Sequence, residues 1–419
     1  MNIFIVEPYT GNEGHFERWA LRTCEALSRL RNDVTLVTYG GLSGGPPEGS
    51  RLFTVLKAAP DGEAPSDWRY HKGKIRMNSF RTFFRREMRE LRTFWLAGSV
   101  ARGQAQSILH FHDADPMLLT LVIRIMLGPK RARRPVIVAA VHEITRLSTA
   151  QGIKRRVYYW LYRRSLARLI RRDADGVLVF DPSLKQRLVS HFGLNAKIAD
   201  RICVLPHGVG DPVEITSKEE ARQRLELDPN ETVFLVFGIL RKDKRLDLAV
   251  EAVTGLLGCR LIIAGGAHDF TEATVKELIQ RKGCEQWVST DVAYLPEERM
   301  HDYFSACDAV IIPYDSSFRG QSGILTLACG HGKPVIASNV GSLGQAVSEH
   351  KLGFAVEPDS ASALREGILR FLSLGPEERA HLEERVSSYA SLMSWDNTCR
   401  EWLDLYQTLL AARGPCSES

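Results

Sequence analysis

The sequence predicts an α/β protein with two doubly wound parallel sheets, one in each half of the 419-residue chain. Short apolar runs alternate with helical patterns almost throughout, which is typical of βαβ units. A stretch rich in glycine and proline at residues 206–214 separates the two series and predicts a linker. Because ligands of such sheets bind beyond the carboxyl ends of the strands, we expect both domains to face one cleft.

The front half starts in a strand and repeats the pattern up to the linker. Its expected strands are residues 3–6, 34–38, 108–111, 136–141, 176–180 and 202–205. Its expected helices are residues 15–30, 116–127 and 154–172. No signal peptide is expected, because no basic and apolar leader precedes the first strand. The longest apolar run, residues 116–127, is interrupted by Arg124 and is shorter than the roughly 20 residues of a membrane-spanning helix.

The back half restarts the same alternation after the linker. Its expected strands are residues 233–237, 260–264, 310–312 and 334–337. Its expected helices are residues 246–257, 271–282, 323–329, 360–373, 377–390 and 395–411. Each half therefore has enough elements for a sheet of its own.

The composition, with 44% hydrophobic and 25% charged residues, is that of a soluble globular chain. Residues 1–200 carry 33 Lys and Arg against 18 Asp and Glu, whereas residues 201–419 carry 22 against 32. A basic front half and an acidic back half indicate domains that meet different partners. The eight cysteines form no CxxC or Cys/His cluster, which favours reduced thiols in a cytoplasmic protein over disulfides or a zinc site.

Two basic residues follow the first strand of the back half. This strand ends at Gly238, and Arg241 and Lys244 lie three residues apart before the next helix. Such cations can clamp a diphosphate, because arginine offers bidentate hydrogen bonds and lysine a mobile charge. A solvated basic turn explains the same spacing equally well.

A serine and a glycine stand where a later loop becomes a helix. Ser322 and the backbone amides of Gly323 and Ile324 are placed to meet a phosphate at the positive end of that helix. An ordinary N-cap at Ser322 is the simpler local interpretation.

Segments along nearly the whole chain resemble, in order, the retaining GT-B glycosyltransferases of the glycogen-synthase-like family 4. They are Thr10-Gly-Asn-Glu-Gly-His15, His110-Phe-His-Asp113, residues 136–142, Val204-Leu-Pro-His-Gly-Val209, and residues 237–244, 261–266, 306–314 and 332–338. The resemblance implies two Rossmann-like domains at residues 1–208 and 209–392. It also implies a helix at residues 393–412 that crosses back to complete the first domain, before a tail at residues 413–419.

The resemblance implies a nucleotide-sugar-dependent transferase whose back domain binds the donor and whose front domain binds the acceptor. The implied catalytic residues are His142, Arg241 and Lys244. The implied donor-binding residues are Gly238, Arg241, Lys244, Gly265, Tyr314, Gln321, Ser322, Gly323 and Ile324. The implied acceptor-side residues are Gly11, Glu13, Gly14, His15, His112 and Asp113.

In this interpretation the two cations of the back domain neutralise the diphosphate leaving group, whose charge grows in the transition state. No cofactor or metal is implied, because side chains and a helix N-terminus replace a divalent ion. His142 is expected to bind the donor sugar, although an isolated histidine at a strand end is more often structural. Retention needs no strong protein nucleophile, since the leaving phosphate can take the acceptor proton. If the enzyme inverts, Glu13 and Asp113 are the candidate bases.

The chain departs from the family where many members carry two glutamates, one that contacts the sugar and one that grips the ribose. Arg319 and Leu327 stand at these positions here. The segment Gln321-Ser-Gly323 resembles a Ser-Gly form found in a subset of the family, so we interpret the chain as a variant enzyme.

The basic charge of the front half is concentrated in residues 76–92 and 154–172. The second segment has eight Lys and Arg, no acid, and the aromatic run Tyr158-Tyr-Trp-Leu-Tyr162. A basic segment with aromatics suits an anionic membrane surface or an anionic acceptor. The alternative is a helix that packs on its sheet through Leu and Val while its arginines are solvated. Nucleic acid is not an expected partner, because no recognised binding module is present.

The predicted function is sugar transfer to a glycan, lipid-linked or other anionic acceptor in cell-surface polysaccharide or glycolipid assembly. The enzyme is expected in the cytoplasm, with the inner face of the membrane as a possible place of action. A transferase with a soluble natural-product or small sugar acceptor, a nucleotide-sugar epimerase, and a weakly catalytic partner of another transferase stay open as alternatives. A dehydrogenase is disfavoured, because no G-x-G-x-x-G motif follows the first strand. The sugar, the nucleotide, the acceptor and the linkage are not specified by the sequence.

Overall fold

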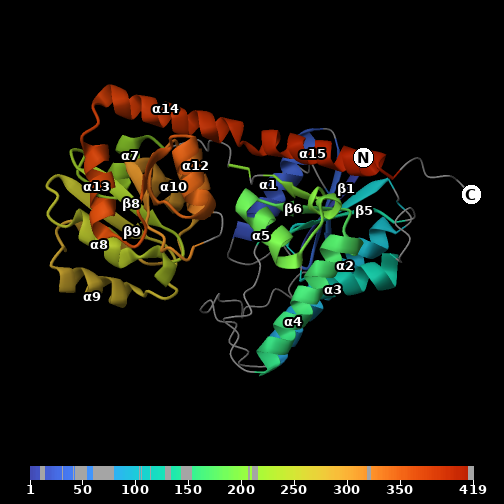
Figure 1. The fold of residues 1–419 in the computed structure, drawn as a ribbon. Helices are drawn as coiled ribbons and strands as arrows, with labels where there is room; N and C mark the ends of the chain where they lie inside the picture. Colours follow the sequence, from blue (N-terminus) through green and yellow to red (C-terminus); the bar gives the residue numbers. More distant parts are fainter. Residues whose placement is uncertain are drawn as a thin grey trace, which may run out of the picture. The chain divides into compact units, whose positions relative to one another are not determined.

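The computed structural model describes residues 1–9, 15–30, 32–40, 42, 54–59, 80–102, 104, 106–113, 115–127, 134–142, 153–205, 208–209, 216–318 and 322–413. The chain divides into two compact units, with boundaries after His207 and after Ser394. The first unit contains the described residues up to Leu205 and those from Trp395 onward, and the second contains residues 208–394. Each unit is described by itself (Figure 1).

The first unit is built on a parallel sheet of seven strands in the order β3-β2-β1-β4-β5-β6-β7. The strands are β1 (Asn2–Glu7), β2 (Asp33–Thr38), β3 (Thr54–Lys57), β4 (Ser107–Phe111), β5 (Val136–Ala140), β6 (Gly176–Val179) and β7 (Ile202–Val204). In the register, Ile3 pairs with Val34 of β2 on one side and with Ile108 of β4 on the other. The strand order therefore reverses between β1 and β4, which is where doubly wound sheets bind their ligands.

Helices cover both faces of this sheet (Figure 1). They are α1 (His15–Arg29), α2 (Phe80–Ala101), α3 (Pro116–Val122), α4 (Ile153–Arg168), α5 (Pro182–Phe192), α6 (Ala196–Ala199) and α15 (Trp395–Ala411). Phe4 and Val6 pack on the side of α2 to α5, whereas Ile3 and Ile5 pack on the side of α1 and α15. Because successive side chains of a strand point to opposite faces, both sets must be apolar in a sheet covered twice.

The second unit has a parallel sheet of six strands in the order β10-β9-β8-β11-β12-β13. The strands are β8 (Thr232–Phe237), β9 (Cys259–Ala264), β10 (Val288–Asp291), β11 (Ala309–Ile312), β12 (Val335–Ser338) and β13 (Gly353–Val356). The helices are α7 (Lys218–Arg224), α8 (Leu246–Val253), α9 (Glu272–Lys282), α10 (Glu297–Ala306), α11 (Gly323–Gly330), α12 (Gly341–Glu349), α13 (Ala361–Leu372) and α14 (Pro376–Leu392). Here the strand order reverses between β8 and β11.

The predicted fold class is confirmed, and two predicted helices need correction. The helix expected at residues 154–172 is α-helical only to Arg168 and continues as a π-helical turn, Leu169–Asp173. The helix expected at residues 116–127 likewise becomes a π-helical turn at Ile123–Leu127. A wider turn inserts one residue and shifts the side chains that follow it around the helix. None of the helices in the described parts of the chain is long and apolar enough to cross a bilayer.

Candidate functional site

Polar side chains of the first unit gather at the carboxyl ends of β1, β4 and β5, where the strand order reverses. Glu7 is the last residue of β1, His112 and Asp113 directly follow β4, and His142 lies two residues beyond β5. We call these four residues the histidine cluster. The doubly wound topology brings them together, because the carboxyl ends of adjacent parallel strands meet at one edge of the sheet.

Glu7 and His112 form a fully buried hydrogen-bonded pair. The distance from His112 Nδ1 to Glu7 Oε2 is 3.0 Å, and Glu7 Oε1 accepts the backbone N–H of Tyr9 at 2.8 Å. Burial raises the pKa of Glu7 to about 8 and lowers the pKa of His112 to about 4. Both shifts favour the neutral forms, so near pH 7 the pair is held together chiefly by a hydrogen bond rather than by opposite charges.

His142 is fixed by a hydrogen bond and by two aromatic rings. Its Nε2 donates to the backbone carbonyl of His112 at 2.8 Å. Its ring is nearly parallel to the indole of Trp19, at 6.1 Å between centroids, and lies 4.8 Å from the ring of Phe180. Burial lowers the pKa of His142, which makes it a neutral polar group near pH 7.

Asp113 is the carboxylate of the cluster that is best suited to proton transfer. Burial raises its pKa to about 6, and the nearby His142 opposes this shift. A carboxyl group with a pKa close to the working pH can take and return a proton. Next to the cluster, Glu90 of α2 accepts the backbone N–H of Asp115 at 3.0 Å.

In the second unit, a loop follows β8 at the point where the strand order reverses. We call residues 238–244 the basic loop. Its backbone is anchored to neighbouring loops, since Leu240 N–H donates to Gly266 O at 2.8 Å and Lys242 N–H to Asp269 Oδ2 at 3.0 Å. It ends in a 3₁₀ turn, Lys242–Lys244, immediately before α8.

Lys244 is nearly buried, with 4% of its surface exposed. Its Nζ donates to the carbonyl of Phe237 at 2.5 Å, which places the ammonium group beside Gly238. Gly238 has a φ of +101°, and a Cβ on it would lie 2.7 Å from Lys244 Nζ. Burial, assisted by Arg241, lowers the pKa of Lys244 to about 7. The negative charge near Lys244, from Asp243, is therefore too weak to keep the pKa of the lysine at its usual value.

Arg241 forms a bidentate ion pair with Asp243, two residues along the loop. The Nε to Oδ1 distance is 3.0 Å and the Nη2 to Oδ2 distance is 2.8 Å. The side chain of Arg241 is 40% exposed, so an incoming anion can reach it. A ligand phosphate must compete with the Asp243 carboxylate for the same two N–H groups.

Among the other residues predicted to bind the donor, one caps a helix, one is buried beside that cap, one allows two loops to approach closely, and one is half-buried. Ser322 caps α11 by accepting the N–H of Leu325 at 3.2 Å, and Tyr314 is buried with its hydroxyl 3.3 Å from Ser322 Oγ. Gly265 allows two loops to approach each other, since a Cβ there would lie 2.3 Å from Gly238 O. Ile324 is half-buried, and its Cδ1 would lie 2.9 Å from a Cβ on residue 238.

Several predicted positions lie outside the described residues, namely Gly11, Glu13, Gly14, Arg319 and Gln321. His15 begins α1. Leu327, at the position of the second family glutamate, is a half-buried residue packed against the core. No group of three or more His, Cys, Asp or Glu in the described part of the chain is placed to hold a metal ion.

Glu7, Trp19 and Asp243 were not predicted from the sequence, although each carries a weak signal. Glu7 directly follows the apolar run of the first strand, just as Asp113 and His142, which the family resemblance implied, follow later strands. Trp19 lies on a helix next to the ligand edge of the sheet. Asp243 stands between the two predicted cations, but its pairing depends on the 3₁₀ turn, which residue spacing alone does not predict.

Two doubly wound units, each with a polar cluster at its point of strand reversal, define the GT-B class of fold. A model of the glycosyl transferases group 1 matches residues 217–389, and a model of Glycosyltransferase Family 4 matches residues 16–211. One match falls on each unit. Together the two matches cover most of the chain with glycosyltransferase family models.

The D-inositol 3-phosphate glycosyltransferase of Acidothermus cellulolyticus is 30% identical over 226 residues, which are 51% of this chain and 49% of the relative. The chain thus spans about half the length of the curated relatives it matches. Sucrose-phosphate synthase from Thermosynechococcus elongatus is 19% identical with a TM-score of 0.70, over 98% of this chain and 100% of that one. Anabaena HepE, solved in complex with UDP, is 16% identical with a TM-score of 0.68, over 97% and 100%. At these identities the two structures show the fold.

Proposed function

We propose that this chain transfers a sugar from a nucleotide-diphosphate donor, which the second unit binds, to an acceptor, which the first unit binds. The observation that carries this proposal is the basic loop, where a buried lysine with a lowered pKa lies beside a glycine at the ligand edge of the sheet. An anion next to Lys244 would restore its charge. The UDP complex of the structural neighbour HepE supports a nucleotide diphosphate as that anion.

The basic loop suits the diphosphate as a leaving group. Departure of the sugar concentrates negative charge on the phosphate oxygens, so a fixed ammonium stabilises the transition state more than the ground state. Arg241 would exchange the carboxylate of Asp243 for phosphate oxygens in the same bidentate geometry. We propose that these side chains act without a metal ion or other cofactor.

The histidine cluster would hold the sugar and the acceptor. His142 keeps its Nε2 bound to a backbone carbonyl, which fixes its ring, and its lowered pKa keeps it neutral. A neutral, oriented imidazole suits a sugar hydroxyl better than a charged one. We propose transfer with retention, in which the leaving phosphate takes the proton of the acceptor hydroxyl. Asp113, with a pKa of about 6, supports the inverting alternative as a general base. The anomeric configuration of the first product, measured by NMR, distinguishes the two.

An anionic acceptor fits the basic first half of the chain, and we propose a glycan or lipid-linked acceptor in cell-surface polysaccharide or glycolipid assembly, at the cytoplasmic side of the membrane. A soluble phosphorylated acceptor is the second candidate. It is favoured by the relatives, which are named for inositol 3-phosphate, and by the neighbour named sucrose-phosphate synthase.

Calorimetric titration with a panel of nucleotide diphosphates, followed by transfer assays with the sugar donors that bind, tests the proposal. We expect one nucleotide to bind, and Arg241→Ala to weaken it at least tenfold. Arg281→Ala, at an exposed arginine of α9, is the matched control and should leave binding unchanged. If no nucleotide binds, or if Arg241→Ala has no effect, the donor assignment fails. Turnover of the donor to its epimer without acceptor would favour the epimerase, and binding without turnover would favour a partner of another transferase.

A further inference from the structure

The outward face of α4 carries large apolar side chains. Ile153, Val157, Trp160 and Leu161 are 80%, 51%, 51% and 44% exposed. Their spacing of four, seven and eight residues from the first one places them along one stripe of the helix. A helix that only packed on its sheet would turn its valine and leucines inward. Leu166 does so, whereas Val157 and Leu161 are exposed.

The neighbouring helix extends this apolar surface. Leu121 of α3 and Ile125 of the π-helical turn after it are 46% and 61% exposed, and α3 packs beside α4 and α2 (Figure 1). Seven large hydrophobic side chains are exposed among the described residues of the first unit, and all seven lie on α2, α4, or α3 with its π-helical turn. Exposed apolar surface gathered on one layer of helices indicates a binding face.

The charged side chains described on this face are positive. Residues 153–168 contain no acidic residue, and Arg156 and Arg164 are exposed on the same side of α4 as the apolar stripe. Arg164 lies over the ring of Trp160, 4.8 Å from its centroid. Arg124, in the π-helical turn after α3, is also exposed and adds a further positive charge.

Some basic residues of the two predicted basic segments are buried or paired with an acid, so they do not belong to this face. Arg89 is 3% exposed and lies over the ring of Tyr39, and Arg168 pairs with Asp173 at 2.9 Å. Residues 76–79 of the first predicted segment lie outside the described part of the chain. Arg89 of that segment is turned into the protein, contrary to its expected place on a partner surface. Arg156 and Arg164 stay exposed beside the apolar stripe.

We propose that the outer surface of α3 and α4 docks on an anionic lipid bilayer, with Trp160 and Leu161 inserted among the acyl chains and Arg156 and Arg164 at the headgroups. Aromatic and aliphatic side chains flanked by arginines match the layered polarity of a membrane surface. A second copy of the chain fits less well, because its arginines would meet arginines. The inference deepens the proposed function, since it gives the first unit access to a lipid-linked acceptor, but it rests on the geometry of these helices alone.

Flotation of the full-length protein with vesicles tests the proposal without donor or acceptor. We expect binding to vesicles of phosphatidylcholine with 30% phosphatidylglycerol, and little binding to phosphatidylcholine alone. The double variant Trp160→Ser/Leu161→Ser, which removes the apolar side chains, should weaken vesicle binding at least tenfold. The double variant Arg156→Gln/Arg164→Gln should weaken it about fivefold for each charge removed. Leu257→Ser, at a site 89% exposed in the second unit, is the matched control and should bind as the wild type does.

Unchanged thermal unfolding of the variants shows that they are folded, as expected for exposed positions. Their donor binding should also be unchanged, so a failure here is distinguishable from a failure of the proposed transfer reaction. Three outcomes overturn the inference: no binding of the wild type to anionic vesicles, equal binding by the Trp160/Leu161 variant, or a dimer in sedimentation that the same variant dissociates.

Discussion

Lys244 is the residue whose proton should depend most on whether an anion is bound. Burial and Arg241 hold its pKa at about 7, and a neighbouring diphosphate would raise it, so binding should take up a proton. Donor affinity is then highest below pH 7 and falls by up to tenfold per pH unit above it. Calorimetry with a nucleotide-diphosphate sugar, in buffers of different ionisation enthalpy, measures both the affinity and the proton uptake.

Two variants separate Lys244 from its neighbour in this experiment. Lys244→Met should bind weakly and lose the pH dependence. Arg241→Ala should bind weakly and keep a pH dependence that begins at a higher pH, because Arg241 no longer lowers the pKa of Lys244. If the donor affinity of Lys244→Met still falls with rising pH, the proton taken up on binding belongs to another group. The same lowered pKa predicts that the second unit becomes more stable from pH 7 to about 10.5, because the unfolded lysine binds the proton through that range.

Gly238 should be intolerant of a side chain for two reasons that can be measured separately. Its φ of +101° strains any other residue by about 1–2 kcal/mol. In addition, a Cβ would displace Lys244 Nζ, so Gly238→Ala should weaken donor binding at least tenfold. Gly258→Ala is the matched control, because its φ is +69° but its Cβ would meet no atom within 4 Å. It should lose stability in thermal unfolding and keep its donor affinity, and equal donor losses in both variants would refute the steric argument.

At the residue scale, the sequence was informative where a polar side chain follows an apolar run. The family resemblance implied His112, Asp113 and His142, each of which follows such a run, and the structure brings them together. The pairing of Glu7 with His112 could not be predicted, since it requires knowing that β1 and β4 are neighbours. The lowered pKa of Lys244 could not be predicted either, because spacing does not reveal burial.

At the scale of elements, the interior strands were predictable and most edge strands were not. Strands such as β1, β5 and β8 are buried on both faces and therefore read as continuous apolar runs. The three strands absent from the prediction, β3, β10 and β13, all lie at sheet edges, where half-exposed positions replace the apolar run. The edge strand β7 was expected, because its apolar residues continue into Leu205.

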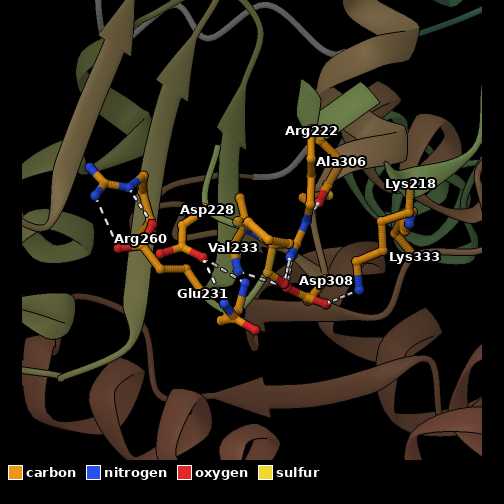
Figure 2. Close-up of polar contacts among 12 residues, drawn as sticks. Lys218, Arg222, Asp228, Glu231, Val233, Arg260, Ala306, Asp308 and Lys333 are labelled. Carbon is orange, nitrogen blue, oxygen red and sulfur yellow. Dashed lines mark hydrogen bonds and ion pairs between the residues drawn. The ribbon is translucent and has the colours of Figure 1, made fainter. Parts of the chain in front are cut away.

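The helix α7 is tied to the sheet of the second unit by the carboxylate of Asp308, which lies just before β11 and is 11% exposed (Figure 2). Its Oδ2 accepts from Val233 N–H at 2.7 Å and from Arg222 Nη2 at 2.8 Å, and its Oδ1 accepts from Lys218 Nζ at 2.5 Å. Arg222 is 5% exposed, so Asp308→Asn leaves a buried cation without its counter-charge. We expect a loss of about 3 kcal/mol in the free energy of unfolding, measured in urea.

The matched control for Asp308 is an exposed ion pair of the same unit. Glu277 and Arg281 of α9 lie 4.0 Å apart with about two thirds of each side chain exposed, so Glu277→Gln should cost less than about 0.5 kcal/mol. Donor affinity should stay unchanged in Asp308→Asn, since Asp308 lies at the amino ends of the strands and the basic loop at their carboxyl ends. A stability loss no greater than that of the control would show that Asp308 does not anchor α7.

At the scale of the whole molecule, the chain begins and ends in the same unit. Trp402 and Tyr406 of α15 are fully buried against the first sheet and α1, and Tyr406 Oη lies 2.6 Å from Nδ1 of His110 on β4. Arg29 of α1 and Asp396 of α15 form an ion pair at 2.7 Å. The first unit is therefore incomplete without the last helix, although nearly 190 residues separate α15 from β7.

Among the described residues, the second unit is one continuous stretch, residues 208–394, and its two ends are joined by backbone contacts. Val209 N–H donates to Met393 O at 2.6 Å, and Val209 pairs with Ser394 in a parallel bridge. We therefore predict that a fragment of residues 208–394 folds alone, unfolds cooperatively on heating, and binds the nucleotide diphosphate with the affinity of the full chain. A fragment of residues 1–207 should instead aggregate, because it exposes the apolar surface that α15 covers.

In the full chain, Trp402→Ala should lower the stability of the first unit by about 3–5 kcal/mol and leave the unfolding of the second unchanged. If the 208–394 fragment needs residues 395–413 to fold, or if Trp402→Ala destabilises both units equally, the two units are one cooperative body and this division of the chain is wrong.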